Sequence, residues 1–286
     1  MAGILDGKSM ALAIKDELRR EVVDWKARGY TPKLAVLLAG ADPASQAYLA
    51  AKQRVCHDVG MVCDVHVLAD LKDTVALQAG LLALIERLNA DEAVGGILVE
   101  MPLPAGVDKG LVLAALDPDK DVDGMSPVNR SRILSGEDGL FPATPMSCLE
   151  MLLRGGVRLA GKHVVVVGRG ETVGKPLVFM LLRHNPTVTI CHSHTRDLGT
   201  VTRLGDVVIT AVGRPGLLRG DMVRPGAVVV DAGTTPTDEG LRGDVVFDEV
   251  AERASLITPV PGGVGALTTV LLLQNVLKGM DRRFGS

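Results

Sequence analysis

Three side chains in the first half of the sequence have the types and the spacing that proton transfer needs. Ser45, Tyr48 and Lys52 are three and four residues apart, so a helix would place them on one face. A tyrosine in contact with a lysine can share a proton with it, and a partly desolvated lysine can act as an acid or a base. An exposed lysine one turn from a half-buried tyrosine is also common on helices, so the spacing alone leaves both interpretations open.

A carboxylate ends an apolar run in the segment "ILVEMPLP", residues 97–104. Glu100 closes the run, and Pro102 and Pro104 follow almost at once. The run has the composition of a strand, and prolines are typical of strand ends rather than strand interiors. Glu100 is therefore predicted to lie at the mouth of whatever the strand points into.

The segment "DKDVDG", residues 119–124, holds three alternating acids, Asp119, Asp121 and Asp123. Calcium loops also alternate acids, but the rest of an EF-hand loop and its closing glutamate are missing here. A turn with solvated acids is one interpretation. The other is that one acid binds a cationic or amide-like heterocycle.

No metal site is expected from the cysteines. Cys56, Cys63, Cys148 and Cys191 form no Cys-x-x-Cys pair, and no His-x-x-x-His lies near them. The sequence therefore indicates neither a zinc site nor a disulfide framework.

A glycine turn stands in the segment "VVVVGRGETVGKP", residues 164–176. Gly168, Gly170 and Gly174 follow a buried strand and open a helix. Glycines at such a turn let the backbone approach a pyrophosphate, and the helix N-terminus supplies N–H groups and a positive dipole. A tight turn that binds nothing is the alternative, but the order of strand, turn and helix favours dinucleotide binding.

The end of the next strand, "TVTICHSHTRD", helps to choose the cofactor. An NAD enzyme usually has an acid there for the ribose hydroxyls. Here Ser193, His194 and Arg196 precede Asp197, and Arg169 lies in the glycine turn, so donors and cations favour the 2′-phosphate of NADP. For His194 and Arg196 individually, a polar surface loop remains an alternative.

Short β-branched runs alternate with segments of helical period, which is typical of parallel strands joined by crossover helices. Strands are predicted at 33–40, 63–68, 94–100, 163–168, 187–191, 206–213 and 227–233, and helices at 43–60, 74–90, 174–183 and 248–254. The polar segment 117–145 is predicted to be a linker with functional loops. We expect a domain at 1–142, a second at 143–266, and a helix at 267–286 that returns to the first.

Composition narrows the class of partner. The 31 basic and 34 acidic residues give a net charge of −3 without a basic run, which argues against nucleic acid or an anionic membrane surface as partner. The N-terminus lacks the apolar core of a signal peptide. The uncharged stretch 254–277 is broken by prolines and glycines, so it reads as a buried helix rather than a membrane span. A reduced cytoplasmic setting is expected.

Ten segments, in order, resemble the bifunctional methylenetetrahydrofolate dehydrogenase and methenyltetrahydrofolate cyclohydrolase family. They are "ASQAYLAAK", "GILVEMPLP", "DKDVDG", "FPATP", "VVVVGRGETVGKP", "TVTICHSHT", "GDVVITAVGRPG", "GAVVVDAG", "GDVVF" and "ITPVPGGVGALT". Each segment is modest alone, but the ordered set covers nearly the whole chain.

The resemblance implies two α/β domains around a cleft, the second a Rossmann-like NADP-binding domain, and a homodimer. It implies oxidation of 5,10-methylenetetrahydrofolate with NADP, then hydrolysis to 10-formyltetrahydrofolate. Lys52 matches the family's catalytic lysine with Tyr48 beside it, and Asp123 matches the acid that holds the pterin ring. On the same pattern Gly168, Arg169, Gly170, Ser193 and Thr234 contact NADP, and Pro261 and Gly262 line the substrate site.

The sequence departs from the family at several positions. Gly170 replaces a serine, "VDGMSPVNR" lacks an aromatic residue and a histidine, and Ala266 and Leu267 replace proline and methionine. Most importantly, Glu100 stands where the family has a glutamine bonded to the catalytic lysine. An ionised carboxylate there stabilises the ammonium form of Lys52, which is a poor base.

We therefore hypothesise that dehydrogenase activity is kept and cyclohydrolase activity is weak or absent. A protonated Glu100 that mimics the amide is the competing possibility. Two other functions stay open at this point: another two-domain NADP dehydrogenase with a shikimate-like substrate, and a catalytically silent folate or nucleotide binder.

Overall fold

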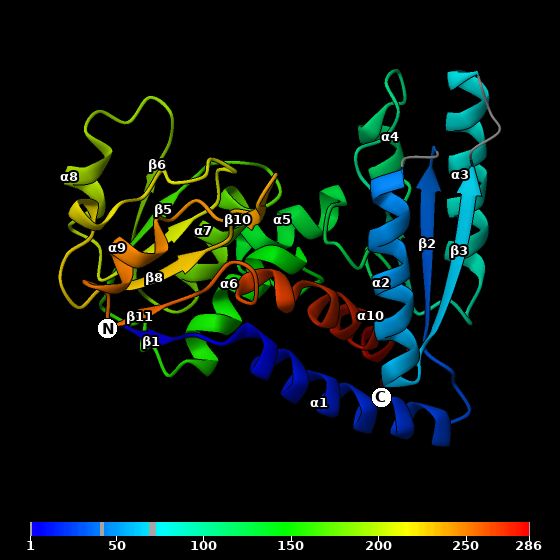
Figure 1. Ribbon diagram of the computed structural model, residues 1–286. Helices are drawn as coiled ribbons and strands as arrows, with labels where there is room; N and C mark the ends of the chain where they lie inside the picture. Colours follow the sequence, from blue (N-terminus) through cyan, green and yellow to red (C-terminus); the bar gives the residue numbers. More distant parts are fainter. Residues whose placement is uncertain (1, 41–42, 69–72, 286) are drawn as a thin grey trace. The chain divides into compact units, whose positions relative to one another are not determined.

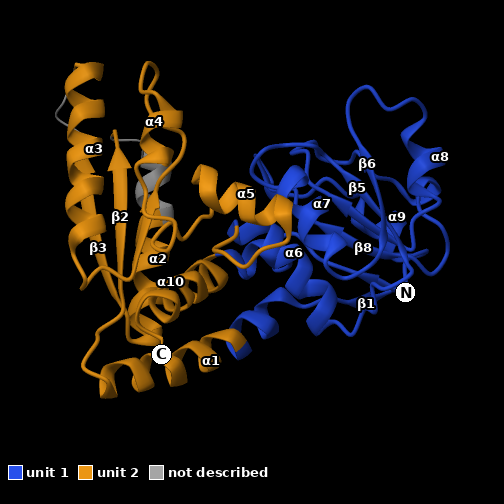
Figure 2. Ribbon diagram, turned by 180° about the vertical axis from the view of Figure 1, so that it is seen from behind, with its two compact units in different colours: residues 1–13, 142–268 blue, residues 14–141, 269–286 orange. Residues whose placement is uncertain are grey.

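The structure is a computed structural model that describes residues 2–40, 43–68 and 73–285, with side chains left out at 43–48. Contacts divide the chain into two compact units, coloured separately in Figure 2. Unit 1 comprises residues 1–13 and 142–268, and unit 2 comprises residues 14–141 and 269–286. Each unit is therefore assembled from two separate stretches of sequence.

The N-terminal residues differ from the expected boundary. Residues 1–13 were expected in the first domain, but the structure places them in unit 1. The reason is strand pairing: β1 (Gly3–Ile4) lies parallel to β11 (Leu256–Ile257), with Gly3 opposite Leu256. Helix α10 (Thr268–Phe284) lies almost entirely in unit 2, which includes residues 269–286.

Unit 2 is built on a three-stranded parallel sheet in the order β3-β2-β4. Strands β2 and β3 lie side by side in Figure 1. The strands are β2 (Lys33–Ala39), β3 (Val62–Leu68) and β4 (Gly96–Val99). The central strand β2 is buried from Leu34 to Leu38, as its continuous apolar run predicts. The helices of this unit are α2 (Pro43–Val59), α3 (Thr74–Ala90), α4 (Lys109–Ala114), α5 (Pro127–Ser135), and most of α1 (Gly7–Ala27) and α10.

The two faces of the unit 2 sheet carry different helices. On one face, side chains of β2 and β4 pack with the apolar stripe of α3 and with α4; this core includes Ala35, Leu37, Ile97, Val99, Leu81, Ile85 and Val112. Because side chains alternate along a strand, Leu34, Leu98 and Glu100 point to the opposite face. A side chain at Gly96 would touch Val276, so α10 packs closely over the start of β4.

Unit 1 contains a six-stranded parallel sheet in the order β1-β11-β8-β7-β5-β6. Its longer strands are β5 (His163–Val167), β6 (Thr187–Cys191), β7 (Val207–Thr210) and β8 (Val228–Asp231). The chain runs from β5 outward to β6 and then returns to the other side of β5 at β7. The carboxyl end of β5 is therefore the topological switch point, where open α/β sheets bind ligands.

The other elements of unit 1 are shorter. They are α6 (Ala143–Arg154), α7 (Gly174–Leu182), α8 (Leu198–Thr202), α9 (Phe247–Ala251), the 3-10 turns η1 (Gly220–Met222) and η2 (Val264–Ala266), and the antiparallel pair β9 (Thr235–Thr237) and β10 (Gly240–Arg242). The expected α/β class with a Rossmann-like second domain is confirmed.

The segment expected to be a linker contains a helix, α5. Ser126 accepts a hydrogen bond from the backbone N–H of Asn129, Pro127 occupies the first turn, and Gly136 ends the helix with a φ of 77°. These are ordinary start and stop signals. The expectation of a loop was wrong here because nine residues give too little apolar periodicity to reveal a helix.

Across the described ranges, no helix is both long enough and apolar enough to cross a bilayer. The uncharged stretch 254–277 contains β11, a proline and glycine turn and η2 before α10 begins.

Candidate active site

The structure brings Lys52 and Glu100 into contact within unit 2. Lys52 projects from α2, and Glu100 follows the last residue of β4, where its backbone N–H donates to the carbonyl of Leu37 at 3.0 Å. The Lys52 Nζ donates to Glu100 Oε1, and the two ends form an ion pair. Glu100 therefore lies at the carboxyl edge of the sheet, as its position after the apolar run predicts.

Both members of this pair are largely withdrawn from water. The side chain of Lys52 is 18% exposed and that of Glu100 is 16% exposed. Solvent screens such a pair less than a pair on the surface. Lys52 and Glu100 are thus held in direct contact at the carboxyl edge of the sheet.

Tyr48 and Ser45 lie on α2, but their side chains fall outside the described residues. The backbone of α2 places Tyr48 one turn before Lys52, as the spacing predicts.

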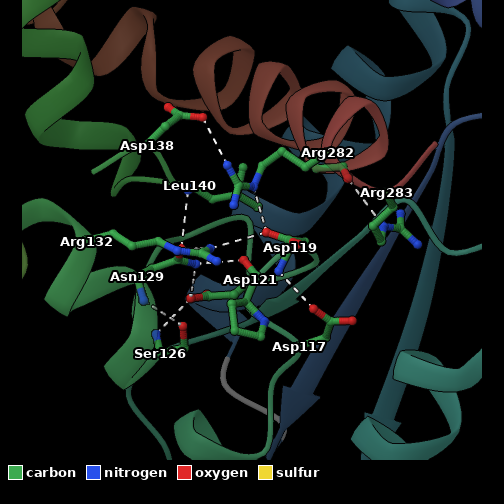
Figure 3. A network of polar contacts seen from close by, with 12 residues as sticks. Asp117, Asp119, Asp121, Ser126, Asn129, Arg132, Asp138, Leu140, Arg282 and Arg283 are labelled. Carbon is green, nitrogen blue, oxygen red and sulfur yellow. Dashed lines mark hydrogen bonds and ion pairs between the residues drawn. The ribbon is translucent and has the colours of Figure 1, made fainter. Parts of the chain in front are cut away.

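Two of the three acids in "DKDVDG" serve the structure. Asp119 is bonded by Arg132 at 3.2 Å and by Arg282 of α10 at 2.7 Å (Figure 3). Burial opposes ionisation of Asp119, but these two hydrogen-bonded cations outweigh it and lower its pKa. Arg282 also reaches Asp138, so one arginine ties α10 to both ends of the segment that contains α5.

Asp121 is buried and organises the turn after it. Its carboxylate accepts hydrogen bonds from the backbone N–H groups of Met125 at 3.2 Å and Ser126 at 2.7 Å, and from the side chain of Asn129 at 3.0 Å (Figure 3). A carboxylate that bonds successive backbone amides fixes a turn firmly. Asp121 is thus engaged within the protein rather than directed to a ligand.

Lys120, between these acids, is 2% exposed and points into unit 2. Its Nζ donates to the carbonyls of Leu88, Asn89 and Asp91 at 2.9, 2.7 and 2.7 Å. These carbonyls end helix α3, where four carbonyls lack a partner within the helix. Lys120 therefore caps the C-terminus of α3 and fastens residues 119–124 to that helix.

Asp123 lies half-buried on the turn that these contacts fix. The next residue, Gly124, has a φ of 60°, and a Cβ there would stand 2.5 Å from the carbonyl oxygen of Leu140. Only glycine fits that close approach. On the other side, Asn275 of α10 donates from its side-chain amide to the carbonyls of Val122 and Phe141, both at 2.7 Å.

The glycine turn has the tight form expected of a nucleotide-binding loop. A Cβ on Gly168, whose φ is 126°, would stand 2.4 Å from the carbonyl oxygen of Ala211, and one on Gly174 would stand 2.2 Å from the carbonyl oxygen of Gly168. At Gly170 a Cβ would meet no atom within 4 Å. A serine at this position would therefore fit without altering the packing. Arg169 and Gly170 are exposed.

The loop after β6 presents donors and a cation to solvent. Ser193, His194 and Arg196 are exposed, and the His192 N–H donates to Thr195 Oγ1 at 2.9 Å. Asp197, the acid nearest the usual ribose position, instead caps α8 by accepting from the N–H and hydroxyl of Thr200. Those bonds lower the pKa of Asp197. The sequence did not reveal this capping role.

The buried acid Asp231, at the end of β8, holds the backbone that follows it and a neighbouring segment. Asp231 accepts from the N–H groups of Gly233, Asp244 and Val245, and Thr210 Oγ1 donates to it at 3.1 Å. Burial raises the pKa of Asp231, and the amide bonds oppose the rise. A cavity of about 370 Å³ lies beside it; Pro215, Gly243, Phe247 and Val260 are among its lining residues.

The remaining expected site residues of unit 1 lie in two turns. Thr234 is exposed just after β8. Pro261 is exposed, and Gly262 has a φ of 105°. Gly7 packs against this second turn, since a Cβ on Gly7 would stand 2.1 Å from the carbonyl oxygen of Gly263.

No cluster of three or more histidine, cysteine, aspartate or glutamate residues suited to a metal ion occurs within the described ranges.

The class of protein follows from unit 1: a parallel sheet with a tight glycine turn at its switch point defines a dinucleotide-binding α/β protein. The chain belongs to the tetrahydrofolate dehydrogenase/cyclohydrolase family. The model of the catalytic domain of that family matches residues 5–123, and the model of its NAD(P)-binding domain matches residues 142–284.

Relatives match over almost their whole length. "Bifunctional protein FolD 2" of Desulfitobacterium hafniense is 57% identical over 98% of this chain and 97% of its own. The bifunctional enzyme from Campylobacter jejuni is 40% identical with a TM-score of 0.95, covering 99% of this chain and 100% of that one. A Trypanosoma brucei relative, solved with NADP and an inhibitor, is 36% identical with a TM-score of 0.91, covering 100% and 99%.

Replacing Asn275 by leucine tests the hold of α10 on the turn that carries Asp123. The substitution leaves the carbonyls of Val122 and Phe141 buried without their donor, so we expect a loss of about 2–4 kcal/mol in the free energy of unfolding. Urea denaturation followed by circular dichroism would measure it. The matched control is Gln274→Leu, one residue earlier and half-buried, for which a change below about 0.5 kcal/mol is expected. Equal losses in both variants would contradict the assignment.

Proposed function

We propose that this protein oxidises 5,10-methylenetetrahydrofolate to 5,10-methenyltetrahydrofolate with NADP as the hydride acceptor. The observation that carries the proposal is family membership over both units, together with the Lys52–Glu100 contact on the sheet edge. The relatives are named as bifunctional FolD proteins and as methylenetetrahydrofolate dehydrogenase-cyclohydrolases. Membership of this family disfavours a shikimate-like substrate, and ligand binding without turnover would indicate a silent binder.

The residues of unit 1 fit NADP. The absence of side chains at Gly168 and Gly174 allows a tight turn whose backbone a diphosphate could approach. At Gly170 the space around the Cβ position is open. Ser193, Arg169 and Thr234 complete the set that we propose contacts the cofactor. When bound, NADP supplies the hydride acceptor, and the protein's part is to bind and orient it.

On the family pattern, we propose that Lys52, Tyr48 and Asp123 hold the folate substrate, and that Pro261 and Gly262 contribute further contacts. Asp123 suits a pterin ring because a carboxylate accepts hydrogen bonds from amino and amide N–H groups. The turn that carries it is held by Asp121 and Asn275, so its position is fixed before the substrate arrives.

Hydride transfer and hydrolysis make different demands on Lys52. Hydride transfer needs mainly orientation, which a charged lysine can supply through hydrogen bonds. Hydrolysis also needs a group that takes a proton from water. On the hypothesis that an ionised Glu100 in contact with Lys52 prevents the lysine from accepting that proton, we propose that the dehydrogenase step is kept and the cyclohydrolase step is weak or absent.

The variant Glu100→Gln tests this division. Its amide orients Lys52 without fixing its charge, so we expect cyclohydrolase activity to rise at least about tenfold while dehydrogenase activity changes less than about twofold. A spectroscopic assay of NADPH formation and of methenyltetrahydrofolate decay measures both steps. Glu86→Gln, an exposed glutamate on α3, is the control and should change neither rate. Equal cyclohydrolase rates in the native protein and in Glu100→Gln would mean that Glu100 already acts as a protonated mimic of the amide.

Cofactor choice is tested by removing the two cations that we propose face the 2′-phosphate. Arg169→Ala and Arg196→Ala should each raise the KM for NADP about 10- to 100-fold, because a charge-assisted hydrogen bond to phosphate is lost. The KM for NAD, which lacks that phosphate, should stay the same. Arg253→Ala, an exposed arginine of the same unit, serves as the control. A parallel rise for both cofactors would indicate a general loss of binding instead.

We also propose that the protein is a homodimer, because the family pattern implies one. We propose a cytoplasmic location because its four cysteines are free thiols. Sedimentation velocity should then give a species near twice the chain mass of 30.1 kDa. A species at the chain mass across the micromolar range would contradict the dimer.

A further inference from the structure

Two cysteines of unit 2 approach each other where α2 turns into β3. Cys56 is fully buried in α2, the chain reverses at Gly60 with a φ of 83°, and Cys63 is the second residue of β3. The backbone N–H of Met61 donates to the carbonyl of Cys56 at 2.9 Å and closes the reversal. The side chains of Cys56 and Cys63 are near enough for each to affect the pKa of the other.

The strand register places this pair on the same side of the sheet as the Lys52–Glu100 contact. Cys63 of β3 and Gly96 of β4 are both opposite Leu34, so their side-chain positions share a face. Side chains two residues apart on a strand share a face, so Gly96, Leu98 and Glu100, which directly follows β4, all lie on that side. Lys52 lies one turn before Cys56 on α2. The thiol pair and the ion pair therefore lie on one helix and one sheet face.

The four cysteines differ sharply in their surroundings. Interaction with the Cys56 thiol lowers the pKa of Cys63; the charge of Lys52 adds to the effect, whereas burial and the charges of Asp64 and Glu100 oppose it. The same interaction, with burial, raises the pKa of Cys56. Burial raises the pKa of Cys148 to about 12 and also raises that of Cys191. Cys63 is half-buried, whereas the other three cysteines are buried. Reactive cysteines have this combination of access and thiolate stabilisation.

We propose that Cys63 is a thiol-modification site, that Cys56 is its resolving thiol, and that their oxidation to a disulfide impairs the activity that depends on Lys52. The last part rests on the proposed function. The first two parts stand on the cysteine pair alone.

The chemistry needs a low-molecular-weight disulfide as the oxidant. The Cys63 thiolate attacks one sulfur of that disulfide, a new S–S bond forms, and the other half leaves as a thiolate. Cys56 then loses its proton to solvent and attacks the sulfur of Cys63, which releases the second half as a thiolate. Two protein thiols are oxidised, and one disulfide is reduced to two thiols. Once Cys63 is modified, its thiolate no longer raises the pKa of Cys56.

The disulfide would join α2 to β3 one turn from Lys52. We expect the cross-link to shift the helix that presents Lys52 and so to displace the lysine from Glu100. A displacement of about 1 Å at a catalytic group can cost about 10²-fold in rate. The thiol pair thus couples the redox state of the surroundings to the proposed folate site.

Labelling of the full chain tests the site without reference to activity. With substoichiometric iodoacetamide, peptide mass spectrometry should find Cys63 modified at least about tenfold faster than Cys148 and Cys191. With oxidised glutathione, the native protein should form a Cys56–Cys63 disulfide, Cys56→Ser should stop at a glutathione adduct on Cys63, and Cys63→Ser should form neither. The proposal would be overturned if all four cysteines were labelled equally fast, or if Cys191 were labelled faster than Cys63. Both results can be detected in the native protein, without any variant.

Activity provides the second arm. The oxidised native protein should lose at least about tenfold of its dehydrogenase rate and recover it with dithiothreitol. Cys63→Ser should keep the basal rate in the presence of oxidised glutathione. Disulfide formation without a change in rate would overturn the link to Lys52. No dehydrogenase activity in the untreated protein would count against the proposed function, while the labelling would still decide on the cysteine pair.

Discussion

Parallel strands all end at one edge of their sheet, and the candidate site residues depend on this constraint. Glu100 follows β4, Gly168 follows β5 and Thr234 follows β8. In each case an apolar strand that is buried on both faces delivers a polar or conformationally special residue to the same edge. The hydrophobic core of each unit thereby sets the positions of groups that take no part in it. The Lys52–Glu100 pair is the clearest case, because α2 returns across the sheet and brings the lysine to the end of β4.

Buried polar groups then fix the loops that leave those strands. Lys120 caps α3, Asp121 binds the backbone of its own turn, and Asn275 bridges two carbonyls that lie far from it in sequence. Such groups are costly to bury unless every donor and acceptor is paired, so each one specifies a single arrangement of the chain around it. The segment 117–141 contains only one short helix, α5, yet it has a defined course for this reason. The acid that we propose for pterin binding, Asp123, lies near its start.

The sequence predicted many of the parts that depend on continuous or periodic apolar runs, although helices α1 and α6 were missed. The buried strands β2, β5, β7 and β8 and the long helix α3 follow from such runs, and the glycine spacing predicted the tight turn at the end of β5. Strand β1 and the pair β9 and β10 were missed because two or three residues carry no period. The capping roles of Asp197 and Lys120 were also missed, since both depend on which backbone groups lack partners in the folded chain. Asn275 could have been noticed as an amide within the apolar face "VLLLQNVL", although its two acceptors could not.

The division of the chain into two interleaved units bears on how the protein is made. Residues 14–141 of unit 2 are synthesised well before residues 269–286 of the same unit. Until α10 emerges, the carbonyls of Val122 and Phe141 lack the donor that Asn275 provides, and the apolar residues under α10 remain uncovered. In unit 1, strand β1 likewise has no pairing partner until β11 has been synthesised. Neither unit is complete when its first segment is synthesised, so unit 2 is finished only after residues 269–286 have been made.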